Sequence, residues 1–234
     1  MKLAIMQPYF FPYIGYFQLM NAVDRFVVYD NIEFTRKGWI NRNRILVNGA
    51  DAFITLSLRK DSDFLQVKDR YLAESWTVDR VKMLNRVLES YRKAPNFEEA
   101  FSLVESCLKF EEENLFGFLF HSIEKIKAYL GIETQLVVSS TIECDHSLRS
   151  EEKVLEMCRT LKASTYINPI GGLDLYSKET FLTSGIELKF LKARFFSYPQ
   201  FNHDFVPWLS VLDVFMFNSR EKVQKEFLIS YDLL

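Results

Sequence analysis

The first 30 residues constrain the fold of this chain more than any other stretch. Lys2–Met6 is a short apolar run without turn residues, which predicts a buried strand. The strand should end at Gln7-Pro8, because proline cannot donate to a sheet ladder. An aromatic loop over residues 9–15, an amphipathic stretch and a second apolar run over residues 25–29 follow. This order predicts an α/β fold in which the loop after the first strand faces the ligand crevice.

The rest of the chain alternates between helical and strand patterns. Asn48-Gly49 separates two strand-like runs, residues 44–47 and 53–58, and predicts a tight hairpin. Residues 76–131 form a mostly helical block, and short strands and helices alternate again from residue 135, with one of these helices expected at 173–183. We therefore expect one α/β domain over residues 1–234. Its sheet should be mostly parallel and Rossmann-like, with helices on both faces and a helical insertion at about 76–131.

Composition excludes several classes of protein. The 234 residues are 48% hydrophobic and have a formal net charge of -2, which argues against disorder and against nucleic-acid binding. No apolar run approaches the roughly 20 residues that span a bilayer, and no signal peptide is visible. The three cysteines include no CxxC pair, so we expect free thiols and a cytoplasmic location.

The aromatic loop after the first strand is the first candidate ligand site. Gln7, Tyr9 and Tyr16 place polar groups on an otherwise apolar scaffold, which is typical of small-molecule pockets. The alternative is a packed loop that closes the edge of the sheet.

The second candidate is residues 36–44, which contain four cations and no acid. Arginine forks bind phosphate or carboxylate, and tryptophan offers a face for stacking. The predicted anion clamp consists of Lys37, Trp39, Asn41, Arg42 and Arg44. The alternative is a solvated edge strand whose charges prevent sheet-to-sheet pairing.

The third candidate is Asn168, followed by Gly171 and Gly172, between a short strand and a helix. Glycines there let backbone amides approach an anion, although neither standard nucleotide fingerprint is present. An ordinary strand-to-helix turn is the alternative. We expect Gln7, Tyr9 and Tyr16 to line the same cleft as Asn168 and Gly171, because both loops follow strands at the carboxyl edge of one sheet.

The fourth candidate is the apolar segment of residues 200–218, which contains His203, Ser210 and Asp213. Pro207 could be the first residue of a helix, and Asn218 the N-cap of the next one. We expect Asp213 to be buried and paired with an arginine of residues 36–44, because a buried carboxylate needs a donor. Helix capping and a structural ion pair are the alternatives.

No metal or cofactor follows from the sequence. Cys144 and His146 could both bind a metal, but two ligands do not make a site.

Four motifs resemble the WbqC-like family of bacteria: AIMQPYFFPYIGYFQLMNAVDRFVVYD, GWINRNRI, YINPIGGLDLY, which ends at Tyr176, and FVPWLSVLDVFMFN. They occur in this order from one end of the chain to the other. Members of that family are often found among genes for surface polysaccharide, including O-antigen. The resemblance therefore implies a role in sugar or nucleotide-sugar modification.

The first motif also resembles the start of nucleotidylyltransferases of the HIGH-type superfamily. Those enzymes have a glycine-histidine pair at the helix entry, where this chain has Gly15-Tyr16. This second resemblance supports the fold class alone.

Together these features predict a transferase that acts on a nucleotide-linked amino sugar and adds an acyl or aminoacyl group. Deprotonating an amine requires a general base, for which Asp30 is the first choice and His203 the second. A nucleotidyltransferase-like enzyme and a non-catalytic binding protein of a polysaccharide assembly complex are the alternatives. The expected partner is a phosphorylated small molecule, and homo-oligomerisation is left open.

Overall fold

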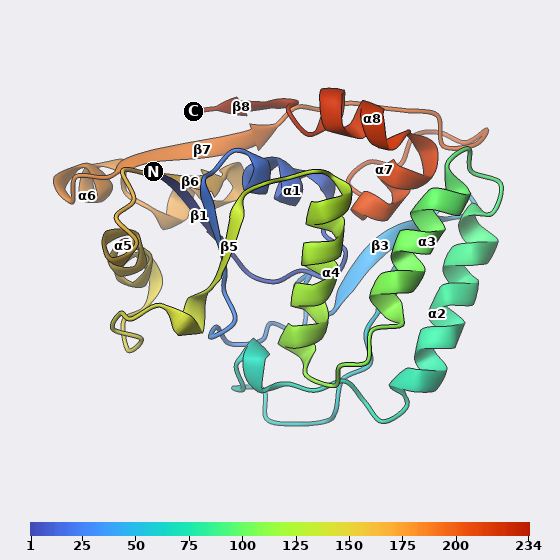
Figure 1. Cartoon of the computed structure of the whole chain (residues 1–234), viewed down its shortest axis with the longest axis horizontal. Helices are drawn as coiled ribbons and strands as arrows, with labels where there is room; N and C mark the ends of the chain where they lie inside the picture. The colour runs from blue at the N-terminus through green and yellow to red at the C-terminus, as the bar shows by residue number, and fades with distance from the viewer.

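The computed structural model describes residues 1–234 and contains a six-stranded sheet with the order β5-β2-β1-β6-β7-β8 (Figure 1). The strands are β1 (Lys2–Met6), β2 (Arg25–Val28), β5 (Gln135–Val138), β6 (Thr165–Pro169), β7 (Glu187–Ala193) and β8 (Tyr231–Leu233). Every neighbouring pair is parallel except β7 and β8. The predicted α/β fold with a mostly parallel sheet is therefore confirmed.

Helices cover both faces of the sheet, as predicted. Side chains alternate along β1, so Leu3 and Ile5 enter one apolar core while Ala4 enters the other. The smaller core lies under α5 (Ser150–Thr160) and α6 (Lys178–Thr183). The larger core includes residues of α1 (Ile14–Asn21) and α7 (Val211–Phe217).

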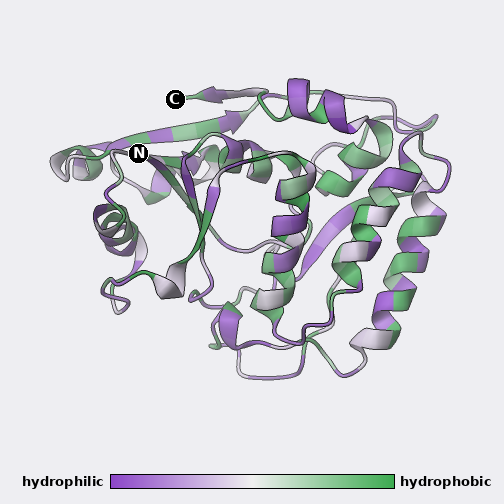
Figure 2. Cartoon of the chain, viewed as in Figure 1, coloured by the Kyte–Doolittle hydropathy of each residue, from purple (hydrophilic) through white to green (hydrophobic).

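The helical segment between β4 (Ala50–Thr55) and β5 consists of α2 (Trp76–Tyr91), α3 (Phe97–Leu108) and α4 (Leu115–Tyr129). Each helix has apolar and polar stripes, visible as green and purple bands in Figure 2. Their buried apolar residues belong to the same 47-residue core as the buried apolar residues of α1. None of the helices combines the length and apolar composition needed to cross a bilayer.

The predicted hairpin is present as β3 (Arg42–Val47) and β4 (Ala50–Thr55). Asn48 and Gly49 have φ angles of 51° and 80°, the two positive values of a type I′ turn. The prediction placed the second strand at residues 53–58. It begins earlier because the two-residue turn pairs Val47 directly with Ala50.

Several helix boundaries differ from the predictions. Pro207 does not begin a helix, since α7 starts at Val211 with Ser210 as its N-cap. The last helix, α8 (Arg220–Lys222), is capped by Ser219 instead of Asn218 and continues as a π-helix over Val223–Phe227.

The helix expected at 173–183 is divided into a 3-10 helix over Ile170–Leu175 and α6. Two further 3-10 helices, Val67–Asp69 and Ser139–Thr141, and strand β8 were not predicted.

Candidate functional site

The carboxyl ends of the parallel strands meet at one edge of the sheet. Met6 is in register with Val28, and Val28 with Val138, so β1, β2 and β5 end level with one another. β5 and β2 lie on one side of β1, and β6 and β7 lie on the other. The chain therefore reverses its strand order between β1 and β6, where ligands bind in open α/β sheets.

Asp30, the predicted base, lies at this edge directly after β2. Its Oδ1 accepts hydrogen bonds from Ser139 Oγ (2.7 Å) and the Ser140 amide (2.8 Å), and its Oδ2 accepts one from Ser140 Oγ (2.6 Å). The carboxylate is buried, and both of its oxygens are occupied. Asp30 thus ties the end of β2 to the 3-10 helix that follows β5.

The neighbours of Asp30 are also polar. Asn31 Nδ2 lies 3.0 Å from His146 Nδ1, and His146 Nε2 lies 2.9 Å from the Ile142 carbonyl oxygen. A carbonyl only accepts, so Nε2 has the proton and Nδ1 accepts from Asn31. Burial, followed by the proximity of Tyr176, raises the pKa of Tyr29 in the same region. Both ring nitrogens of His146 are therefore engaged.

Asn168 and Gly172 fix the loop after β6. Asn168 Oδ1 accepts a hydrogen bond from Tyr166 Oη (3.1 Å), and a Cβ atom on Gly172 would lie 2.0 Å from Asn168 Nδ2. Gly171 is exposed, and a Cβ atom there would meet nothing within 4 Å. Tyr176 packs edge-on against Tyr166, with ring centroids 5.7 Å apart. Gly172 is therefore needed for the close packing of this loop, whereas Gly171 is not.

The loop after β1 lies at the same edge, because β1 and β6 are parallel neighbours. Gln7 is half-buried, and its carbonyl oxygen accepts a hydrogen bond from Tyr16 Oη (3.2 Å). Tyr16 is buried, so it supports this loop from inside. The prediction that Tyr16 lines a cleft is therefore wrong. The Tyr16 hydroxyl is engaged by the Gln7 carbonyl oxygen and is not offered to a phosphate at the surface.

Tyr9 and Trp39, from the first two candidate segments, line one pocket of about 120 Å³. The pocket is completed by Pro12, Tyr13, Asn43 and Trp208, and we call it the aromatic pocket. Its segments follow β1, β2 and β7, whose carboxyl ends lie at one edge of the sheet. Its walls do not include Asn168 or Gly171, and a cleft shared by the loops after β1 and β6 stays a prediction.

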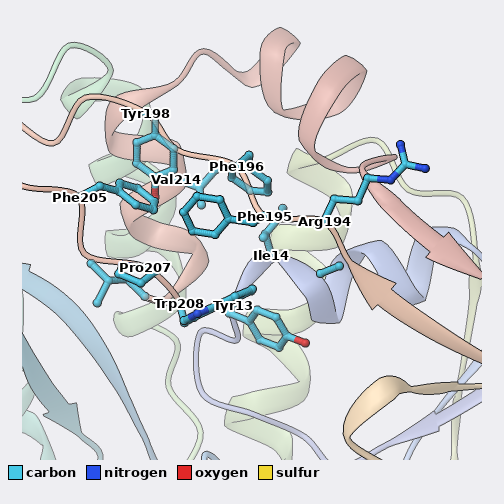
Figure 3. Close-up of a pocket in the computed structure, with 12 residues that line it drawn as sticks. Tyr13, Ile14, Arg194, Phe195, Phe196, Tyr198, Phe205, Pro207, Trp208 and Val214 are labelled. Atoms are coloured by element: carbon cyan, nitrogen blue, oxygen red, sulfur yellow. The ribbon is translucent and has the colours of Figure 1, made fainter.

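A second, more apolar hollow shares Tyr13 and Trp208 with the aromatic pocket (Figure 3). The rings of Phe195, Phe205 and Tyr198 gather around it, and ten of its twelve lining residues are hydrophobic. Figure 3 shows the Arg194 guanidinium directed away from these rings, and its Nε donates to Asp232 Oδ1 (3.0 Å). The hollow, of about 30 Å³, has no unpaired charge on its walls.

Trp208 is held in an unusual conformation. Its φ angle is 59°, a value that is rare for a bulky residue, and 51% of its surface is exposed. Arg44 Nη2 donates to the Trp208 carbonyl oxygen (3.3 Å), and the Arg44 guanidinium lies 5.6 Å from the centre of the Trp39 ring. Arg44 therefore links the two tryptophans of the aromatic pocket.

The other residues of the predicted anion clamp have separate surroundings. Arg42 donates from Nη2 to the Lys37 carbonyl oxygen (2.7 Å) and lies 4.7 Å from the centre of the Phe53 ring. Lys37 is exposed, and Asn41 Nδ2 donates to the Leu56 carbonyl oxygen (3.0 Å). Neither Arg42 nor Lys37 lines the aromatic pocket, and phosphate binding by the clamp stays a prediction.

Asp213 is buried, as predicted, but the expected arginine partner is wrong. Its Oδ1 accepts from Tyr91 Oη (2.8 Å), and its Oδ2 accepts from Tyr198 Oη (2.7 Å) and Gln200 Nε2 (2.6 Å). Three neutral donors satisfy the carboxylate, so no cation is needed to bury it. Arg44, an arginine of the segment expected to pair with Asp213, forms an ion pair with Asp51 instead (3.2 Å).

Ser210 and His203 are on the segment that follows β7. Ser210 is buried, and its Oγ donates to the Phe11 carbonyl oxygen (2.7 Å), which fixes the aromatic loop and leaves no surface for substrate. His203 is exposed and lies over the hairpin turn, where a Cβ atom on Gly49 would be 2.8 Å from its ring. Neither residue lines the aromatic pocket.

The WbqC-like protein family model matches residues 7–225 of this sequence. The chain belongs to the WbqC-like family. It is 29% identical over 220 residues to "Uncharacterized protein Rv1507c" of Mycobacterium tuberculosis, with 93% of each chain covered. No solved structure matches the chain.

Sequence reasoning missed several residues of this WbqC-like protein's sheet edge. Tyr13 and Trp208 complete the aromatic pocket, and Ser139 and Ser140 hold Asp30. A signal existed for each, since Tyr13 and Trp208 lie within motifs that resemble the family and the serine pair follows a predicted strand. Sequence alone could not show that these segments meet.

Proposed function

We propose that this protein is a transferase that acts on a nucleotide-linked amino sugar in surface polysaccharide or O-antigen biosynthesis. The group transferred would be an acyl or aminoacyl group. The main support is the aromatic pocket, in which two exposed tryptophans from distant parts of the sequence meet at the carboxyl edge of a parallel sheet. Trp39 and Trp208 are 38% and 51% exposed, although large aromatic rings are normally covered.

The chemistry of the pocket suits one ring of a nucleotide sugar. Nucleobases stack on aromatic side chains through their flat π faces, and sugar rings pack on them through faces lined by C–H groups. A volume of about 120 Å³ is small compared with the roughly 300–1,000 Å³ of whole-ligand sites. The aromatic pocket would therefore hold the base or the sugar, and the remaining part of the substrate would extend along the sheet edge.

The transfer needs a base at the amine of the sugar. The amine nitrogen attacks the carbonyl carbon of the acyl donor, the base accepts the amine proton, and the donor's leaving group departs. Asp30, at the end of β2, and His203, on the segment after β7, are the proposed bases. Asp30 is the first choice of the two because it lies at the carboxyl edge of the sheet, where the substrate is proposed to bind.

The proposal is tested by screening nucleotide-linked amino sugars in a thermal-shift assay. A ligand at about 100 times its Kd should stabilise the fold by roughly 2.7 kcal/mol. Trp39→Leu and Trp208→Leu should remove this shift, whereas Phe64→Leu should keep it. Phe64 is a matched control because it is 81% exposed and does not line the aromatic pocket. If both tryptophan variants respond as the wild type does, ligand binding at this pocket is refuted.

One observation favours a second candidate, a non-catalytic binding protein of a polysaccharide assembly complex. Both oxygens of Asp30 and both ring nitrogens of His146 already have hydrogen-bond partners. Mass spectrometry of the bound sugar after incubation with acyl donors distinguishes the two. Binding of a nucleotide sugar that stays unmodified with every donor would favour the second candidate.

A further inference from the structure

A separate pocket of about 300 Å³ lies between the segment that joins β2 to β3 and the segment that joins β4 to α2. Four cations line it, Arg36, Arg59, Lys60 and Arg70, together with Asn41 and Asp61. We call it the basic pocket. It shares no lining residue with the aromatic pocket.

Backbone pairing builds one side of the basic pocket. The Val67 amide donates to the Ile32 carbonyl oxygen (2.9 Å), and the Phe34 amide donates to the Leu65 carbonyl oxygen (3.1 Å). These bonds hold the chain before Arg70 alongside the chain before Arg36. Residues that are far apart in sequence are thereby fixed around one opening.

Arg70 is the least expected member of this pocket because it is only 5% exposed. Its guanidinium makes one hydrogen bond, from Nη2 to the Ser62 carbonyl oxygen (2.7 Å), and lies 4.3 Å from the centre of the Phe34 ring. Nε is buried without an acceptor. Burying a guanidinium without a carboxylate is unfavourable, and Arg70 has five N–H donors to satisfy.

The charges of the pocket do not cancel. Arg36 pairs with Asp63, and Arg59 pairs with Glu113 (2.5 Å). Lys60 and Arg70 form no ion pair with any carboxylate. The acid among the lining residues is Asp61, whose Oδ1 accepts a hydrogen bond from the Ser62 amide (2.7 Å). Positive charge therefore remains at the pocket.

Asn41 adds a complementary group. Its Nδ2 donates to the Leu56 carbonyl oxygen (3.0 Å), but its buried Oδ1 has no donor. A ligand that satisfied both Arg70 and Asn41 would need acceptor oxygens and a hydroxyl or amine donor. A phosphate group on a hydroxyl-bearing molecule has this combination.

We propose that the basic pocket is a binding site for a phosphate ester, with Arg70 as its central anion contact. Lys60 and Arg59 supply charge at the rim, and Asn41 accepts a hydrogen bond from a hydroxyl of the ligand. Arginine suits this position because its planar fork binds two phosphate oxygens at once. The proposal concerns binding only, and it stands apart from the transferase proposal.

The test uses glycerol 3-phosphate, a phosphate ester with two hydroxyl groups, as the probe in isothermal titration calorimetry at low ionic strength. We expect saturable binding to the full chain. Arg70→Lys should weaken it at least tenfold because the fork is lost, and Lys60→Gln should weaken it severalfold. Arg86→Gln, on the exposed face of α2 and away from the basic pocket, should bind as the wild type does.

A residue-specific readout keeps the test decisive if Arg70→Lys fails to fold. The Nε–Hε signal of Arg70 in a ¹H–¹⁵N spectrum should shift on titration with glycerol 3-phosphate, and that of Arg86 should not. Lys60→Gln should reduce the shift at a given glycerol 3-phosphate concentration. The proposal is overturned if glycerol 3-phosphate does not bind, or if Lys60→Gln and Arg86→Gln have equal affinities for it. These results would leave the transferase proposal untouched, because they involve no residue of the aromatic pocket.

Discussion

Tyr198 donates a hydrogen bond from its hydroxyl to Oδ2 of Asp213 at 2.7 Å, and this carboxylate has no cationic partner. Burial raises the pKa of Asp213 from its ordinary value of 3.8 to about 6, while the donors Tyr198, Gln200 and Tyr91 oppose that rise. The folded protein therefore binds this proton more tightly than the unfolded chain does. The stability contributed by this group must fall as the pH rises from about 4 to about 6.

The first prediction uses Asp213→Asn, which cannot titrate. The free energy of unfolding of the wild type, minus that of the variant, should decrease by up to roughly 3 kcal/mol between pH 4 and pH 6. Urea denaturation at several pH values measures the free energy of unfolding of the wild type and of the variant. A difference that stays constant with pH would show that Asp213 has an ordinary pKa in the folded state.

The second prediction concerns the carboxylate of Asp30. Ser140→Ala removes the hydroxyl donor of Oδ2 and should destabilise the fold by about 1.5–3 kcal/mol, the range for a hydrogen bond to a charged group. Thr141→Ala is the matched control, because its exposed hydroxyl donates to the Val138 carbonyl oxygen and does not reach Asp30. Chemical denaturation measures the free energy of unfolding of the Ser140→Ala and Thr141→Ala variants. Equal losses would mean that water replaces the Ser140 hydroxyl without cost.

The third prediction separates the two glycines after β6. Gly172→Ala should destabilise the fold by about 1–3 kcal/mol, because its Cβ atom would lie 2.0 Å from Asn168 Nδ2. Gly171→Ala should have little effect or stabilise by up to about 1 kcal/mol, since nothing lies within 4 Å. Melting temperatures of both variants test this. A larger loss for Gly171→Ala would contradict the packing described for this loop.

The fourth prediction couples the hairpin turn to His203. Gly49→Ala should cost about 1–2 kcal/mol for the left-handed φ of 80°, plus a further loss from contact with the His203 ring at 2.8 Å. In a His203→Ala background only the first loss should remain. A double-mutant cycle of unfolding free energies measures the coupling, and strictly additive losses would show that the ring moves aside freely.

The sequence by itself determined the parallel α/β fold, most strands and the tight turn at Asn48-Gly49. These features depend on local patterns: apolar runs, helical spacing and the φ values that short turns require. It also identified the aromatic loop and residues 36–44, but as two separate candidate ligand sites. Tyr9 and Trp39 do line one pocket, because both segments leave the carboxyl edge of the same sheet.

Only the tertiary structure decided which polar groups meet. The sequence predicted an arginine for Asp213, but folding brings Tyr91 and Tyr198 to it from distant elements. Likewise Arg70 faces the same pocket as Arg36 only because backbone hydrogen bonds align the segments before them. Local propensity acts over a few residues, whereas side-chain pairing depends on how whole elements pack, and a single sequence does not encode that packing in any short pattern.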